Sequence, residues 1–409
     1  MSVDILELCP AQRRLRITRA GAAILMVVAA LLLAQRLHTI SHRYDQFDFV
    51  VFYGWWTDYS NGGDPWTDQR GPMLGCNYTP AFIEIFSPLA RIDQQTAFWI
   101  WQAAQIVCMV IAVLLLARGS ASPPGIAPTI IVLSLVMLSS PFASALVWSQ
   151  IAPMLLALLS AAWFFARRQR PAAAGLLMAL AALLKLYPAA AAGYFLFGRR
   201  WRALSWTIGS FTAGVLLTNP AHWIELARQG LPIAYRISGR HGLSVLSFVR
   251  TSVAYFGGTR INAEPLFAVW GLTALIDLVL IAIAGAATIT AQGRADLDDL
   301  AFGLWVALAV LMSPLAWRQD FILPLPACLF GLIAAWQSFE PRAPTRNIAL
   351  IAGSVMLAFS IVSALIKAVP GPSFPMLLAT YLGAALIFRA RMRLESPRAE
   401  AQTASDRAS

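Results

Sequence analysis

Long apolar runs alternate with short polar connections along almost the whole chain. A membrane-spanning helix needs about 20 apolar residues, and runs near that length recur from residue 18 to residue 388. They predict spans at 18–37, 97–117, 126–140, 150–166, 172–184, 187–197, 203–218, 265–288, 297–312, 321–339, 348–369 and 374–388. The two around Lys185 are short and could be half-length or broken helices. The pattern predicts an all-α polytopic membrane protein with about twelve transmembrane helices.

Two connections, 44–92 and 219–264, are much longer than the others. Both are too apolar for disordered linkers, and we expect amphipathic helices on the membrane surface in each of them. A shorter connection, 313–320, reads SPLAWRQD. The last segment, 394–409, is small and polar, which predicts a disordered tail. Residues 1–393 are therefore expected to form a single membrane domain.

Composition and charge agree with the membrane assignment and orient the chain. Charged residues make up 12% of the 409 residues, about half the share of a soluble protein. The net charge of +11 does not indicate nucleic-acid binding, because the arginines cluster in short connections beside apolar runs. Placing both termini in the cytoplasm puts 19 of the 31 basic residues inside. The first run lacks a clear cleavage site and is read as an uncleaved span, so both long connections and 313–320 lie outside.

The first long connection carries the strongest candidate for acid–base chemistry. Asp48 stands between two phenylalanines in FDFVVFYGWW, just beyond the first span. Partial desolvation there would raise its basicity toward the working pH. A structural alternative is that Asp48 caps the surface helix that starts at this point. Asp45 could serve equally on chemistry alone, and Asp64 in GGDPW is more simply part of a turn.

Two basic residues on the outer side are candidates for binding an anionic group. Lys185 in LLKLYP is one of only two lysines, and an ammonium at this depth could bind a lipid phosphate. Its alternative role is a snorkelling anchor, which suits the other lysine, Lys367. Arg318 could supply a second phosphate contact or pair with Asp320 or another outer acid.

Nucleotide-binding signatures are missing from the sequence. Neither a GxxxxGK[ST] loop nor a Rossmann glycine pattern occurs, and nucleotides are scarce on the outer side of a membrane. A reaction there needs an activated, membrane-borne substrate or a gradient. The interleaved acids and aromatic residues of the first long connection would suit a surface that stacks on a sugar or lipid.

Several motifs in fixed order resemble those of the bacterial polyprenyl-phosphate-mannose-dependent alpha-mannosyltransferases, which are integral membrane C-type glycosyltransferases. They are FDFVVFY, GGDPW, YTP with FSPLA, LLKLYP and SPLAW, and the likeness covers about residues 13–388. It implies the C-type glycosyltransferase fold. It also implies inverting transfer of a hexose, mannose in this family, from a polyprenyl-phosphate sugar to a hydroxyl of a lipid-linked or cell-envelope glycan. Asp48 matches the family's base, and Lys185 matches the lysine beside the donor phosphate.

The same resemblance implies a setting and a set of contacts. The protein would be a multi-pass, monomeric enzyme of the bacterial inner membrane with its active site on the periplasmic face. Its partners would be the donor, the acceptor and the lipid bilayer. Donor phosphate contacts would come from Lys185 and Arg318. Further substrate contacts would come from Tyr53, Trp55, Tyr78, Tyr187, His241 and Trp317.

The chain also departs from the family pattern in two places. Arg318 and Gln319 stand where a histidine is common, and His241 begins HGLS where an Asn often precedes the Ser. Either difference could change the donor sugar or the acceptor, and an inactive or repurposed member fits the same residues.

Polyprenyl phosphate is a good leaving group once its charge is matched, so one base and one phosphate clamp would suffice. The histidines do not stand at ligand spacing with acids, and the four cysteines form no CxxC. We therefore expect no metal, no cofactor and no disulfide framework.

Two other functional classes compete with the enzyme. One is a secondary transporter or flippase, and the other is a non-catalytic scaffold. An enzyme needs its acid in the outer connection, whereas a transporter needs one at mid-membrane, where Asp277 is the candidate.

Overall fold

The chain was analysed in a computed structural model. It describes residues 10–42, 48–66, 78–230, 244–258, 265–338, 350–358 and 374–392, with single positions at 76, 232, 235, 242, 260 and 348. Every regular element within these ranges is a helix. The all-helical prediction is thereby confirmed for the described part of the chain. Asp45 and His241 lie outside it, as does the predicted tail 394–409.

Most of the described helices coincide with predicted apolar runs, whereas most of the predicted span 348–369 lies outside the described residues. In chain order they are α1 (Pro10–Ser41), α2 (Asp48–Ser60), α3 (Pro80–Phe86), η3 (Ser87–Arg91), α4 (Gln94–Gly119), α5 (Ile126–Leu138), α6 (Ser140–Val147), α7 (Ala152–Arg167), α8 (Pro171–Leu184), η4 (Tyr187–Ala192), α9 (Gly193–Phe197), α10 (Trp201–Leu217), α11 (Pro220–Glu225), η5 (Leu226–Gly230), α13 (Val245–Phe256), α14 (Leu266–Thr290), α15 (Ala295–Leu311), η6 (Arg318–Ile322), α16 (Leu325–Ser338) and α18 (Phe374–Met392).

Not all of these helices are long enough to cross a membrane alone. Four described stretches are long and apolar enough, namely Thr18–Ser41, Gln94–Gly119, Leu266–Thr290 and Arg318–Ala335. The α5–α6 pair makes a fifth if its 53° bend is counted within one span. The predicted spans on either side of Lys185 are α8, with 14 residues, and the short elements η4 and α9. These short elements agree with the alternative that the spans around Lys185 are half-length or broken helices. The total of twelve spans remains a prediction.

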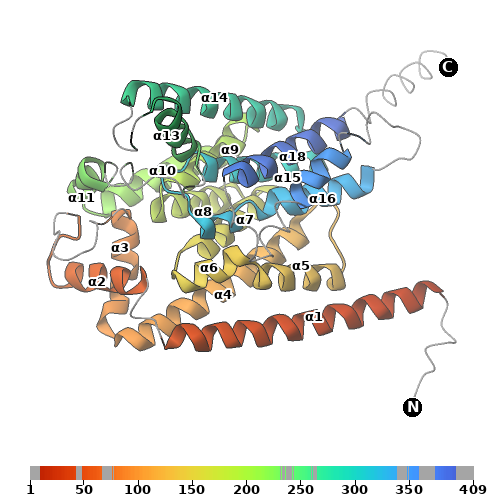
Figure 1. The fold of residues 1–409 in the computed structure, drawn as a ribbon, viewed down its shortest axis with the longest axis horizontal. Helices are drawn as coiled ribbons and strands as arrows, with labels where there is room; N and C mark the ends of the chain where they lie inside the picture. Colours follow the sequence, from red (N-terminus) through yellow and green to blue (C-terminus); the bar gives the residue numbers. More distant parts are fainter. Residues whose placement is uncertain are drawn as a thin grey trace.

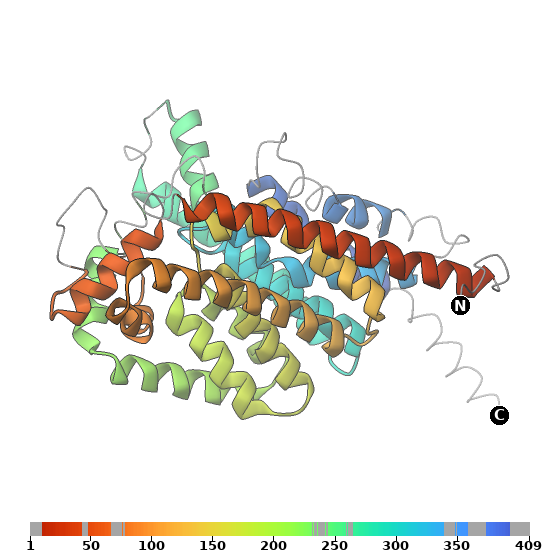
Figure 2. The ribbon, with the colours of Figure 1, turned by 90° about the horizontal axis from the view of Figure 1, so that it is seen from below.

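Both long connections contain helices, as expected from their apolar content. The first holds α2 and α3, and the second holds α11 and α13. In Figure 1, α2, α3 and α11 gather at one end of the molecule, while α1 begins and α18 ends at the other. Figure 2 shows the same separation from below. The helices α2 and α3 of the first long connection and α11 of the second thus lie together, away from the start of α1 and the end of α18.

Small residues let neighbouring helix backbones approach closely in the core. A Cβ added at Gly175 of α8 would lie 2.5 Å from the Ala203 carbonyl oxygen of α10. One added at Gly303 of α15 would lie 2.7 Å from the Cα of Ala327 in α16. Close approach of this kind is common between helices in membranes. It fixes α8, which ends just before Lys185, and α15, which leads toward Asp320.

Candidate active site

A threonine ties the first long connection to the break after α8. Thr79 precedes α3, and its hydroxyl accepts a hydrogen bond from the Phe82 N–H (3.2 Å), so it caps the start of that helix. The same hydroxyl donates to the carbonyl oxygens of Leu183 and Leu184 (3.2 Å to the latter), which α8 leaves unpaired at its end. The YTP and LLKLYP motifs therefore meet, and Tyr78 is brought beside Lys185.

Lys185 is held by an acid and two aromatic rings. The residue is extended, with φ −155° and ψ 131°, and directly follows α8. Its ammonium lies 3.4 Å from Oδ1 of Asp320, which is 1% exposed, and over the rings of Tyr78 (5.6 Å) and Tyr187 (5.1 Å). The Tyr187 hydroxyl donates to the same Asp320 oxygen (2.9 Å). These contacts fix the Lys185 side chain, which is 16% exposed and so remains partly open to a ligand.

Asp48 joins the same cluster from the start of α2. Its Oδ2 accepts a hydrogen bond from Nε2 of Gln150 (2.6 Å), and Oε1 of Gln150 accepts one from the Tyr78 hydroxyl (2.8 Å). Gln150 stands in the turn between α6 and α7 and is 5% exposed. Asp48 does begin a helix, as the capping alternative required. Its carboxylate is nevertheless turned to a buried side chain that leads on to Tyr78 and Lys185.

The electrostatics of the cluster suit a base. Burial raises the pKa of Asp48 above its ordinary value, while the Gln150 hydrogen bond and the Lys185 charge pull it back. Burial, and then the charges of Asp320 and Asp48, raise the pKa of Tyr78 well above the usual value for a phenol. Tyr78 therefore stays protonated and acts as a donor. The cluster offers a partly desolvated carboxylate and a cation within electrostatic range of each other.

The other predicted site residues occupy varied positions. Trp55 packs against the cluster, with its ring 6.1 Å from that of Tyr78. The backbone N–H of Trp317 donates to Oδ2 of Asp320 (3.0 Å). The hydroxyl of Tyr53 instead donates to the carbonyl oxygen of Ile92 (2.7 Å), which holds α2 against the segment that follows η3.

The pairing of Arg318 with Asp320, one of the alternatives considered for this arginine, does not form within the described ranges. Arg318 is exposed and has no ion pair within the described ranges, and the Asp320 carboxylate pairs with Lys185 instead. A guanidinium left at the surface beside this cluster remains free to meet an anion from outside.

Two cluster residues were not identified from the sequence. Gln150 was placed at the start of an apolar span, and Asp320 was considered only as a partner for Arg318. Both carried a signal, because a polar side chain next to an apolar run costs free energy unless it has a partner. Sequence order could not show that their partners lie 102 and 135 residues away.

The two long connections also contact each other through aromatic rings. Trp66 of the first connection stacks on His222 of α11, with ring centroids 4.7 Å apart and an interplanar angle of 27°. The Trp66 indole N–H donates to the Tyr78 carbonyl oxygen (3.0 Å), which links this stack to the cluster. Its own backbone N–H donates to Oδ1 of Asp64 (3.0 Å), so the turn expected at GGDPW is confirmed.

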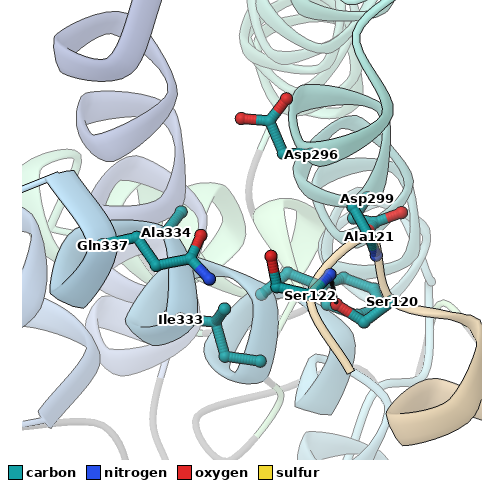
Figure 3. A pocket seen from close by; sticks show the side chains of 9 residues that line it. Ser120, Ala121, Ser122, Asp296, Asp299, Ile333, Ala334 and Gln337 are labelled. Atoms are coloured by element: carbon teal, nitrogen blue, oxygen red, sulfur yellow. Dashed lines mark hydrogen bonds between the residues drawn. The ribbon is translucent and has the colours of Figure 1, made fainter. Parts of the chain in front are cut away.

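A hollow at the start of α15, the end away from Asp320, is built differently (Figure 3). Its lining includes Ser120, Ala121, Ser122, Asp296, Asp299, Ile333, Ala334 and Gln337. Its acids are already engaged. Asp299 pairs with Arg167 and accepts a hydrogen bond from the Ala121 N–H (2.8 Å), and Asp296 pairs with Arg391. These pairs tie helix ends together, and the hollow offers no free acid for chemistry.

Asp277, the acid on which a transporter would depend, lies within α14 and is half-buried. Its Oδ1 has no hydrogen-bond partner in the part of the chain that the structure describes. It belongs to a helix that packs on α9, α13, α15 and α18 rather than on the segments that carry Asp48 and Lys185. Within the described ranges no group of three His, Cys, Asp or Glu could hold a metal ion, and the expectation of a metal-free reaction stays a prediction.

Comparison with known proteins gives two matches. The model of glycosyltransferase family 87 matches residues 77–314. A curated relative from Mycobacterium tuberculosis is 24% identical over 335 residues, which cover 74% of this chain and 74% of the relative. Its name is polyprenol-phosphate-mannose-dependent alpha-(1-2)-phosphatidylinositol mannoside mannosyltransferase. The matched family range includes Tyr78, Gln150 and Lys185, whereas Asp48 and Asp320 lie outside it.

Proposed function

The chain belongs to glycosyltransferase family 87, and we propose that it transfers a hexose from a polyprenyl-phosphate sugar to a hydroxyl of a lipid-linked or cell-envelope glycan. The name of the mycobacterial relative supports this donor class and mannose as the sugar. The observation that carries the proposal is the cluster itself. It places one partly desolvated carboxylate, Asp48, within electrostatic range of one fixed cation, Lys185.

The proposed reaction is a single displacement with inversion at the anomeric carbon. Asp48 takes the proton from the acceptor hydroxyl, and the new bond forms between that oxygen and the anomeric carbon. The bond from the anomeric carbon to the phosphate oxygen breaks, and the electron pair leaves with the polyprenyl phosphate. A cation near the leaving oxygen stabilises the charge that develops there more than it stabilises the ground state. Lys185 is the fixed cation for this role, and the exposed Arg318 is the second.

The arrangement of the molecule supports an outward-facing site. The segments that carry Asp48 and Tyr78 gather at the end opposite the start of α1 and the end of α18 (Figure 1). With both termini in the cytoplasm of a bacterial inner-membrane protein, that end is periplasmic, where a lipid-linked donor replaces a nucleotide sugar. Trp55, beside Tyr78, supplies an aromatic face of the kind on which sugar rings stack.

The test is a donor panel. Purified protein is incubated with a lipid extract as acceptor and with labelled polyprenyl-phosphate mannose, polyprenyl-phosphate glucose or GDP-mannose. We expect transfer from polyprenyl-phosphate mannose, none from GDP-mannose, and almost none in Asp48→Asn. Transfer from GDP-mannose alone would overturn the donor class. Undiminished transfer in Asp48→Asn would overturn the base.

A further inference from the structure

Gln150 determines which oxygen of Asp48 is free. A carboxylate on a surface helix has two equivalent oxygens and several rotamers. Here Oδ2 is bound by Nε2 of Gln150 at 2.6 Å, the short distance expected when the acceptor is charged. Within the described residues Oδ1 accepts no hydrogen bond. The carboxylate is thus held by one oxygen, and the other remains available to a hydroxyl.

The amide of Gln150 is itself oriented from its other side. The Tyr78 phenol donates to Oε1 (2.8 Å), so the amide nitrogen must face Asp48. With the opposite orientation the amide oxygen would face an ionised carboxylate oxygen, which is repulsive. Tyr78 is 6% exposed and precedes Thr79, the residue that ties α3 to the end of α8. The orientation of the amide is therefore set from the Lys185 side of the cluster.

The backbone at Gln150 is fixed as well. Ser149 adopts a left-handed conformation with φ 52°, and the Gln150 N–H donates to the Ala145 carbonyl oxygen (2.8 Å). The buried indole N–H of Trp101 donates to the Ser149 carbonyl oxygen (2.7 Å). A non-glycine residue in this region costs free energy and persists only where its surroundings hold it. This turn presents a glutamine side chain to the start of α2 and keeps it there.

We propose that Gln150 is a positioning residue for the base. Its amide holds Oδ2 of Asp48, and the Tyr78 hydroxyl holds the amide, so that Oδ1 alone faces the acceptor hydroxyl. A neutral amide cannot carry the proton onward, so the chain from Tyr78 to Asp48 orients the carboxylate and does not relay protons. This inference rests on the proposed function, in which Asp48 is the base.

The arrangement also has a consequence for titration. Besides Gln150, the groups in this cluster that act on Asp48 are the Lys185 ammonium and the Tyr78 phenol. A donor on a carboxylate stabilises the charged form, so the Gln150 amide lowers the pKa of Asp48 against the effect of burial. Removing that donor must raise this pKa. Because a base acts when deprotonated, the acid limb of the rate profile must move to higher pH.

The chain offers a matched control. Gln102 is also a buried glutamine against the same turn, and its Nε2 donates to the Leu146 carbonyl oxygen (3.0 Å) and to Oγ of Ser149 (3.0 Å). It makes no hydrogen bond to Asp48. Gln102→Met therefore removes buried amide contacts at the same place without removing the donor to the base.

The experiment compares Gln150→Met, Gln102→Met and Tyr78→Phe. Single-turnover transfer from polyprenyl-phosphate mannose is followed against pH. The Asp48 carboxyl is titrated separately by infrared spectroscopy, with the Asp48→Asn spectrum subtracted. In Gln150→Met we expect the single-turnover rate constant at saturation to fall about 10- to 100-fold, with the concentration that gives half-saturation little changed. We expect the infrared midpoint and the acid limb to rise together by about one pH unit.

The controls separate positioning from simple loss of structure. Gln102→Met should lower the thermal unfolding temperature and leave the infrared midpoint in place. Tyr78→Phe should shift the infrared midpoint in the same direction as Gln150→Met, but by a smaller amount. If Gln150→Met fails to fold, Tyr78→Phe is used for the test instead. An unchanged infrared midpoint and an unchanged single-turnover rate constant in a folded Gln150→Met would overturn the inference. Wild-type transfer by Asp48→Asn would instead overturn the assignment of the base, and the infrared midpoint would still report on the Gln150 contact.

Discussion

Breaking the Lys185–Asp320 pair tests whether the lysine binds the donor or only balances an acid. Lys185→Met keeps the length of the side chain and removes its charge. It leaves the Asp320 carboxylate, 1% exposed, with the Tyr187 hydroxyl and the Trp317 N–H as its remaining partners. A loss of activity in this variant alone would therefore have two explanations. Asp320→Asn separates them, because it removes the negative charge and keeps an oxygen in place.

The two explanations predict different losses of stability and of transfer rate. Removing one partner of a buried ion pair costs about 3–5 kcal/mol. Since Lys185 is 16% exposed and Asp320 keeps two hydrogen bonds, we expect about 2 kcal/mol of stability to be lost in Lys185→Met, and most of it to return in the double variant. Loss of a charged contact to the transition state costs about 3–4 kcal/mol, or roughly 10²–10³-fold in rate. A phosphate-binding lysine predicts that this rate loss persists in the double variant.

The measurements are thermal unfolding in detergent and single-turnover transfer from labelled polyprenyl-phosphate mannose. They are made on wild type, the two single variants and the double variant. Lys185→Arg should recover only part of the rate, because a planar guanidinium does not fit a site built for an ammonium. If Lys185→Met/Asp320→Asn transfers sugar as fast as Asp320→Asn alone, Lys185 is only the counterion of Asp320. The phosphate clamp would then be wrong.

Four further outcomes test the assignments made above. Asp48→Asn should lower turnover about 10²–10⁴-fold while donor binding survives. The wild-type rate should rise with pH through a midpoint above that of an exposed aspartate, because burial raises the pKa of Asp48, and a midpoint at or below the exposed-aspartate value would contradict this. Thr79→Val should cost about 1–3 kcal/mol in thermal unfolding, because it removes the hydroxyl that serves both α3 and α8, and an unchanged unfolding temperature would show that this joint is dispensable. A cysteine at the exposed turn residue Asn61 should react with an impermeant thiol reagent from outside intact cells, and labelling only after the inner face is opened would invert the proposed orientation.

The sequence by itself determined the class of protein and most of its helices. Apolar runs are a property of the chain alone, because each spanning helix satisfies its own backbone groups. Three local features could also be read from the sequence: the start of α2 at Asp48, the turn at Asp64 and the break around Lys185. Each depends on residues only a few positions apart. The motifs that carry the family resemblance are local as well, and family membership bears that resemblance out.

Only the tertiary structure decided which polar groups meet. Asp48 with Gln150 and Lys185 with Asp320 are contacts between residues more than a hundred positions apart. Sequence reasoning considered Asp320 only as one possible partner of Arg318, because the two are close in the chain. The fold gave it to Lys185, since Thr79 fixes the end of α8 and η6 turns the carboxylate inward. Hydrogen bonds and ion pairs act over a few ångströms, and such distances are set by how helices pack and not by the order of residues.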